Sequence, residues 1–344
     1  MRIRRTRDQV RPRSDSDPVL PYPNGWFCVG TAAEWRPKTV LTKPFMGQEI
    51  VVYRTERGTL RAVRPHCPHL GAHLGFGGTV DGELLVCPFH RFAFGPDGAC
   101  ARTPYGLPPR AGLQLVPVTQ AAGLVWAWHS HDGTPPSWQL PEKLTRLSTR
   151  HIHIRSLEVD GHSLDVAENA IDFRHFPHVH RIDAEALSEP KEDGPFYHMD
   201  IRLRRPMPPF GTIVQDFSVS LIGVAGPFVE IDLPLAHARV TGCVFSTPIA
   251  PRRNRIHFVS AATFTRPGRP SRGVSRIAAG VLESAVSRVL GRYHYRDAAH
   301  DFPIWSHREF LPHPRINGAD SPIGPFRIWA RQFYPSVGED REAK

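Results

Sequence analysis

The stretches Cys67-Pro68-His69 and Cys87-Pro88-Phe89-His90 carry the most specific pattern in this 344-residue chain. Each stretch pairs one cysteine with one histidine, and 17 residues separate the two. Two thiolates and two imidazoles in this arrangement suit a [2Fe–2S] cluster in which the cysteines bind one iron and the histidines bind the other. The prolines and the nearby glycines favour tight loops around such a cluster. The pattern therefore predicts a one-electron redox centre.

A structural zinc site is the alternative for these four ligands, because zinc also binds two cysteines and two histidines. Zinc fingers pair cysteine with cysteine and histidine with histidine at short spacing. Each motif here mixes the two residue types. The mixed pairing favours a Rieske-type centre, whose histidine ligands raise the reduction potential to roughly −150 to +300 mV.

The remaining cysteines and the apolar runs bear on the compartment. Cys28, Cys100 and Cys243 are scattered, which indicates no disulfide framework and fits a reducing cytoplasm. No apolar run approaches the roughly 18 residues that a membrane span requires. Residues 1–18 are polar and rich in arginine, so we expect a disordered basic arm rather than an export signal.

The chain is basic, with 43 lysines and arginines against 33 acidic residues and a net charge of +10. Residues 1–18 contribute +3 of this charge, which leaves +7 on the body. We find no basic helix, zinc finger or aromatic RNA-binding signature, so we expect no nucleic-acid partner. A basic body suits the docking of an acidic electron-transfer partner, and simple solubility explains the charge equally well.

Length and pattern predict an α+β chain of two domains. Short strand-like segments between glycine and proline clusters indicate a small all-β domain that carries both cluster motifs. From about residue 150, alternating apolar and polar residues predict an antiparallel sheet. We place the domains at 19–134 and 150–337, with a proline-rich linker between them. The predicted strands of the sheet are 151–159, 197–203, 212–224 and 256–264.

Two helices are predicted to interrupt this sheet. The first covers residues 163–176 and ends at Pro177, because proline lacks the backbone donor that a continuing helix needs. The second covers 272–290 and is closed by Gly291, with an apolar face at i, i+3, i+4 spacing that we expect to pack on the protein. That face consists of Val274, Ile277, Val281, Leu282, Ala285, Val286, Val289 and Leu290.

The end of the first helix is a candidate for a second metal site. Asp172 and His175 are three residues apart and therefore lie on one helical face. His180 follows Pro177, where the chain can turn and aim a second imidazole at the same point. Two histidines and a carboxylate form the facial triad of non-haem Fe(II) oxygenases. A solvated histidine cluster is the alternative, but a Rieske-type centre needs an acceptor for its electrons.

On these motifs the chain resembles the oxygenase component of the Rieske non-haem iron oxygenases. Its paired motifs are similar to the family's C-x-H…C-x-x-H, and residues 172–180 resemble its D-x-x-H-x₄-H. The chain is most similar to the branch that contains bacterial 3-ketosteroid 9α-hydroxylase and animal cholesterol 7-desaturase. The segments that favour this branch are 23–30, 301–305 with D-x-x-I-W, and 321–334 with R-x-W-x-x-Q-F-Y.

The resemblance implies a role for each matching residue. The cluster ligands would be Cys67, His69, Cys87 and His90, and the ligands of a mononuclear iron would be His175, His180 and Asp301. Asp172 would bridge His175 to a cluster histidine, with His90 favoured, in a neighbouring subunit of a ring-shaped homotrimer. A carboxylate on the outer nitrogen of a metal-bound histidine fixes its tautomer. Asn169 is a candidate polar residue beside the iron, and helix capping is its alternative role.

Two ligand alternatives and two departures accompany this resemblance. His178 could replace His180, although the family's spacing favours His180. Asp297 lies one helical turn before Asp301 but lacks the following x-x-I-W. Phe92 stands where tryptophan is commoner in the family, and Arg91 replaces a frequent glycine. We expect both changes to affect packing and potential at the cluster.

The resemblance also implies an N-terminal all-β Rieske domain, a C-terminal helix-grip catalytic domain and a reaction. That reaction is the O₂-dependent hydroxylation or desaturation of an apolar polycyclic, steroid- or sterol-like molecule. Electrons would come from NAD(P)H through a separate reductase, a ferredoxin or both. Two alternatives stay open: a Rieske electron carrier with a ligand-binding C-terminal domain and no mononuclear iron, and a zinc-structured binding protein.

Overall fold

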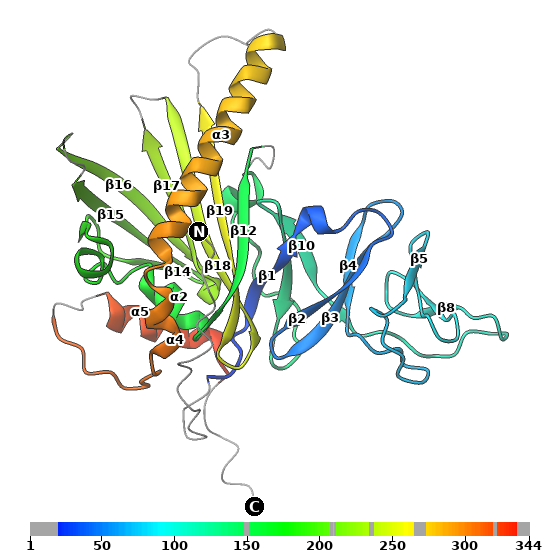
Figure 1. Cartoon of the computed structure of the whole chain (residues 1–344). Coiled ribbons are helices and arrows are strands. Elements are labelled where there is room, and N and C mark those ends of the chain that lie inside the picture. The colour runs from blue at the N-terminus through cyan, green and yellow to red at the C-terminus, as the bar shows by residue number, and fades with distance from the viewer. Residues whose placement is uncertain are drawn as a thin grey trace, which may run out of the picture.

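The computed structural model describes residues 20–147, 151–206, 209, 211–233, 237–264, 273–318 and 322–335. A small N-terminal β part lies beside a large antiparallel sheet that one long helix crosses (Figure 1). This arrangement confirms the predicted α+β class. The expected arm at 1–18 and the first residue of the expected closing segment, Ser321, lie outside the described residues. Over the described ranges, we find no helix with both the length and the apolar character for a membrane crossing.

The N-terminal part consists of three small antiparallel sheets, ordered β1-β11-β10, β2-β3-β4-β9 and β5-β6-β7-β8. The strands are β1 (Gly25–Thr31), β2 (Val40–Phe45), β3 (Gln48–Arg54), β4 (Leu60–Val63), β5 (Thr79–Asp81), β6 (Leu84–Val86), β7 (Ala93–Phe94), β8 (Cys100–Arg102), β9 (Leu115–Val116), β10 (Val118–Ala121) and β11 (Leu124–His129). The short helices are η1 (Ala32–Glu34) and α1 (Glu142–Thr145). The two cluster motifs occupy the β4–β5 and β6–β7 loops, at the outer end of this part (Figure 1).

The C-terminal sheet has eight strands in the order β12-β19-β18-β17-β16-β15-β13, with β14 paired to β15. Its strands are β12 (His153–Asp160), β13 (Asp183–Ala186), β14 (Lys191–Asp193), β15 (Phe196–Pro206), β16 (Thr212–Ile222), β17 (Pro227–Leu233), β18 (Ala238–Ala250) and β19 (Arg253–Phe264). We did not predict β17 and β18. Proline normally argues against a strand interior, and here Pro248 lies where the β18–β19 register shifts.

One hydrophobic core continues from the N-terminal part into the large sheet. Trp126 of β11 meets Phe245 of β18 edge to face, with ring centroids 4.7 Å apart. The Thr247 hydroxyl donates a hydrogen bond of 2.6 Å to the backbone oxygen of Cys28 in β1. The N-terminal part is therefore packed directly against the C-terminal sheet through β18. The predicted domain limits at 19–134 and 150–337 stay predictions.

The predicted first helix is wrong in extent. Helix α2 (Ser163–Asn169) ends early, and a separate π-helical turn, η2 (Phe176–His180), follows after a series of turns. Pro177 lies in the first turn of η2 and does not end a helix. The missing backbone donor costs nothing in a first turn, because the first N–H groups of a helix have no intrahelical acceptor. Asp172 and His175 thus lie in the connecting turns and not on a regular helical face.

The predicted second helix is also wrong in extent and in its buried face. Helix α3 (Gly273–Ala298) continues past Gly291, and its side chains are described from residue 280 onward. Val281, Leu282 and Val289 are 65%, 53% and 64% exposed. Small residues face the sheet instead: a Cβ on Gly291 would lie only 2.3 Å from Cδ2 of His153. Close approach of the helix backbone to β12 explains why glycine is tolerated inside this helix.

The described C-terminal residues also form the short helices η3 (Gly223–Ala225), α4 (Phe302–His307), α5 (Ile323–Ala330) and η6 (Arg331–Phe333). Arg327 of α5 belongs to the predicted closing motif, and it donates hydrogen bonds to Glu168 of α2, including one of 3.1 Å from Nη2 to Oε1. Arg308 donates to the same carboxylate. The Glu168 side chain is only 3% exposed, so both arginines offset a buried charge and tie α2 to the C-terminal helices.

We expect Arg327→Met to lower the free energy of unfolding by about 3 kcal/mol, near the low end for breaking a buried ion pair, because Arg308 stays in place. Urea denaturation of the whole chain measures this loss. Arg239→Met is the matched control, since Arg239 pairs with the exposed Asp232 at 2.7 Å and should contribute less than about 1 kcal/mol. Equal losses in the two variants would contradict the role given to the Glu168 contact.

Candidate metal centres and substrate cavity

The two cluster loops bring Cys67 beside Cys87 and His69 beside His90. The Cys67 N–H donates to the Ala72 oxygen at 2.9 Å and the Cys87 N–H donates to the Phe92 oxygen at 2.8 Å, so each loop folds back on itself. Both cysteines are buried and form no disulfide. Burial and the neighbouring Cys87 thiol raise the pKa of Cys67 to about 11, while a hydrogen bond from the His69 backbone opposes the shift. Bound iron would deprotonate such thiols.

The two imidazoles lie at the tip of these loops. The rings of His69 and His90 are 4.7 Å apart between centroids, at an interplanar angle of 74°. Phe92, one of the two departures from the family pattern, stacks on His69 at 4.3 Å with nearly parallel planes. Arg91, the other departure, has a φ of 59°, a left-handed conformation that glycine adopts more easily. Four donors of the right type on two loops fit a Rieske cluster.

The elements η2 and α4 bring His175, His180 and Asp301 to one point. His175 directly precedes η2, His180 ends η2, and Asp301 occupies the N-cap position of α4 without a side-chain capping bond. Nε2 of His175 lies 3.2 Å from Nε2 of His180, and Asp301 Oδ1 lies 3.9 Å and 3.4 Å from these two atoms. All three donor atoms fall within 4.8 Å of one another. The Asp301 Oδ1 atom is buried without a hydrogen bond within the described structure. These residues fit a single iron(II) with open positions.

Asp172 and Asn169 flank His175 on opposite nitrogens. Asp172 Oδ2 lies 3.7 Å from the outer nitrogen, Nδ1, of His175, and Asn169 Nδ2 lies 3.3 Å from Nε2. Burial alone would raise the pKa of Asp172, but its contact with His175 and the N–H of Arg174 lower it overall. The Asp172 side chain stays 31% exposed, which leaves one side of the carboxylate open to another group. The predicted bridging position is therefore geometrically accessible.

The two alternative ligands lie elsewhere in the structure. His178 is exposed and does not join the three donor atoms. Asp297 accepts a hydrogen bond from Arg205 of β15, and the Arg205 guanidinium also lies 4.6 Å above the Tyr293 ring. This contact connects α3 to β15. The Asp297 carboxylate thus has a structural partner.

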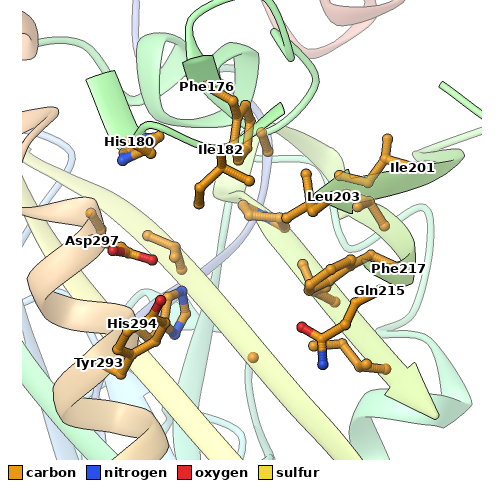
Figure 2. A pocket seen from close by; sticks show the side chains of 18 of the residues that line it. Phe176, His180, Ile182, Ile201, Leu203, Gln215, Phe217, Tyr293, His294 and Asp297 are labelled. Carbon is orange, nitrogen blue, oxygen red and sulfur yellow. The ribbon is translucent and has the colours of Figure 1, made fainter. Parts of the chain in front are cut away.

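A cavity of about 440 Å³ lies between α3 and the sheet and reaches His180 and Asp301. Figure 2 shows Phe176 and His180 at one side, strand residues such as Ile201 and Phe217 at another, and Tyr293, His294 and Asp297 from α3. The strand walls are mostly apolar, although Arg205, Gln215, Thr241 and Ser260 also line the cavity. The apolar strand residues include Ile201, Leu203, Ile213, Phe217, Val219, Val229, Ile231, Leu233, Val240 and Val244. A cavity of this size with few polar groups is typical of a small-molecule site.

We did not predict these lining residues. The signal was present as the alternation of apolar residues along β15 to β18, since every second side chain of a strand faces the same side. Alternation alone does not tell whether that side meets a packed core or an open cavity. In this protein that side meets a cavity, because space remains between α3 and the strands near His180 and Asp301.

Two protein-family models match this chain. Residues 25–116 match the Rieske [2Fe-2S] domain, and residues 127–334 match the 3-Ketosteroid 9alpha-hydroxylase C-terminal domain. The first match contains all four cluster residues, and the second contains the three residues of the second site. The second match spans more than half of the chain.

Curated relatives and solved structures agree with these matches. The cholesterol 7-desaturase nvd of Bombyx mori is 29% identical over 96% of this chain and 73% of the relative. The probable 3-ketosteroid-9-alpha-monooxygenase, oxygenase component, of Rhodococcus rhodochrous is 27% identical over 98% of this chain and 86% of the relative. Among solved structures, dicamba monooxygenase bound to dicamba has a TM-score of 0.60 at 18% identity, covering 92% of this chain and 98% of that chain. NdmB of Pseudomonas putida CBB5 has a TM-score of 0.63 at 18% identity, covering 91% and 93%. These two structures share the fold.

Proposed function

Because this chain belongs to the 3-ketosteroid 9α-hydroxylase C-terminal domain family and carries a Rieske domain in front, we propose that it hydroxylates or desaturates a steroid- or sterol-like substrate. It is an oxidoreductase, the terminal oxygenase component of a Rieske system, and its cofactors are a Rieske [2Fe–2S] cluster and a mononuclear iron. The observation that carries the substrate class is the apolar cavity that reaches His180 and Asp301. The names of the Bombyx mori and Rhodococcus rhodochrous relatives support the same class.

Each candidate residue has a part in this reaction. His175, His180 and Asp301 would hold the iron, and Cys67, His69, Cys87 and His90 would hold the cluster. The bound iron supplies the activation of O₂ at the cavity end. The apolar walls bind the substrate rings and exclude water. The Asn169 side-chain amide contacts Nε2 of His175 and helps to position that imidazole. The outcome, hydroxylation or desaturation, depends on how the walls place the substrate carbon.

Electrons reach the catalytic site from another subunit in this proposal. The cluster loops lie at the outer end of the N-terminal part, away from α2 and α4 of the same chain (Figure 1). The partly exposed Asp172 is therefore proposed to contact His90 of a neighbouring subunit in a homotrimer. NAD(P)H would act through a separate reductase, a ferredoxin or both, in the cytoplasm. The basic net charge supports docking of an acidic electron donor.

Iron and acid-labile sulfide, measured on anaerobically purified protein, test the two-centre proposal. We expect about three irons and two sulfides per chain. About two irons with two sulfides would favour an electron carrier without mononuclear iron, and zinc without sulfide would contradict the cluster. A panel of steroids and other polycyclic compounds, assayed with isotope-labelled O₂ and a surrogate reductase, then tests the substrate class.

A further inference from the structure

His294 is a polar side chain of the cavity wall that the proposed reaction does not use. It lies in α3 seven residues before Asp301, which follows the end of α3 at Ala298. Its ring packs edge-on against Phe258, with centroids 5.5 Å apart. Figure 2 shows His294 beside Tyr293, with Asp297 between His294 and His180. His294 therefore lies away from the metal end of the cavity.

The His294 imidazole has no hydrogen-bond partner within the described ranges of the chain, and it lines the cavity. Burial lowers the pKa of His294 to about 4, with Asp297 opposing the shift in part. The ring is thus neutral near pH 7 and offers one N–H donor and one nitrogen acceptor. A ligand that fills the cavity displaces water from the imidazole, so a ligand that supplies a hydrogen-bond partner there gains affinity.

A second polar group faces the same space. Ser260 of β19 pairs with Gly242 of β18, and both line the cavity. A Cβ on Gly242 would lie 3.5 Å from Cε1 of His294, so the imidazole packs over Gly242 and a larger side chain there would crowd it. The Ser260 hydroxyl, like the imidazole, has no partner among the side chains that the structure describes. Directly paired strand residues have Cβ positions about 5 Å apart, so Ser260 lies next to the position that His294 packs over.

We propose that His294, together with Ser260, binds an oxygen atom of the substrate at the end remote from the reacting carbon. The oxygen is a hydroxyl or a carbonyl on an otherwise apolar polycyclic molecule, since a neutral imidazole and a hydroxyl can each donate or accept. This inference rests on the proposed function and adds a specificity-determining residue to it. Anchoring one oxygen away from the metal end selects which substrate carbon meets the iron site.

Equilibrium binding of three matched steroids tests this inference without turnover. The probes are androstane, which has no oxygen, and its 3-keto and 3-hydroxy derivatives, and quenching of tryptophan fluorescence reports binding because Trp305 lines the cavity. We expect the wild-type chain to prefer the oxygenated derivatives by about tenfold. His294→Phe should remove most of this preference while androstane binds as before, and His294→Gln should keep part of it.

Two further variants separate recognition from cavity shape. Phe217→Leu, on another wall, should weaken all three probes alike. Gly242→Val crowds the imidazole without changing α3 and should reduce the preference as well, even if His294→Phe does not fold. Equal wild-type binding of all three probes, or full preference in His294→Phe, would overturn the proposed role of His294 but leave the steroid-like substrate class in place. Failure of every probe to bind would overturn the steroid-like substrate class and this inference with it.

Discussion

Anaerobically purified His180→Ala protein should contain about one iron fewer per chain than the wild type, with its acid-labile sulfide unchanged. The His180 side chain is only 6% exposed, and its Nε2 lies within 3.4 Å of both other donor atoms. Removing one of three ligands leaves two donors, which hold Fe(II) weakly. Because metal activation contributes several kcal/mol to such a reaction, product formation should fall by about a thousandfold or more.

His178→Ala is the matched control for this prediction. It removes an imidazole two residues away that is exposed and outside the donor set. We expect this variant to keep both its iron and its activity. Loss of iron in His178→Ala, with full iron in His180→Ala, would reassign the ligand. Asp301→Ala should behave like His180→Ala, whereas Asp297→Ala should keep its iron because that carboxylate pairs with Arg205.

The second large effect should follow from Asp172→Ala, which we expect to retain both metal centres and to lose reductase-coupled turnover. Asp172 lies beside the outer nitrogen of His175 and not among the donor atoms. Loss of such an outer partner lowers activity by roughly 10–100-fold, and loss of an electron route adds to this. Reoxidation of the reduced cluster in the presence of substrate and O₂, followed by visible absorption, should slow accordingly.

Two controls separate electron transfer from iron binding in this variant. Product formation driven by hydrogen peroxide needs no electron from the cluster, so Asp172→Ala should retain it. Co-expression of Asp172→Ala with Cys67→Ser chains tests the subunit arrangement. If the bridge crosses between subunits, mixed oligomers regain part of the activity that each variant lacks. No recovery in verified mixed oligomers, or normal coupled turnover in Asp172→Ala, would contradict the proposed bridge.

Much of the candidate site could be predicted from local sequence. Cys67 and His69 stand in one short motif and Cys87 and His90 in another, so the members of each pair are close because they are neighbours in the chain. The β4–β5 and β6–β7 loops then bring the two pairs side by side. His175 and His180 also meet, although the helix expected between Ser163 and Phe176 ends at Asn169. The prediction that His175 and His180 meet did not depend on the helix, because the short segment between them keeps the two residues close.

Residues that lie far apart in the sequence could not be paired from local patterns. Asp301 was assigned from the resemblance of residues 301–305 to a family motif, not from spacing. Glu168 and Arg327 are also far apart in the chain, and only packing of α5 against α2 brings them into contact. The exposed apolar stripe of α3 was predicted to be buried, because periodicity does not tell which face of a helix meets a sheet.

The sequence by itself determined the redox class of this protein, because ligand type and short spacing are properties of residues close together in the chain. Only the tertiary structure decided which carboxylate faces the two histidines, that Asp297 pairs with Arg205, and that His294 lines an apolar cavity. These outcomes depend on contacts between elements far apart in sequence. Such contacts are set by how the helix and the sheet pack, which no local pattern encodes.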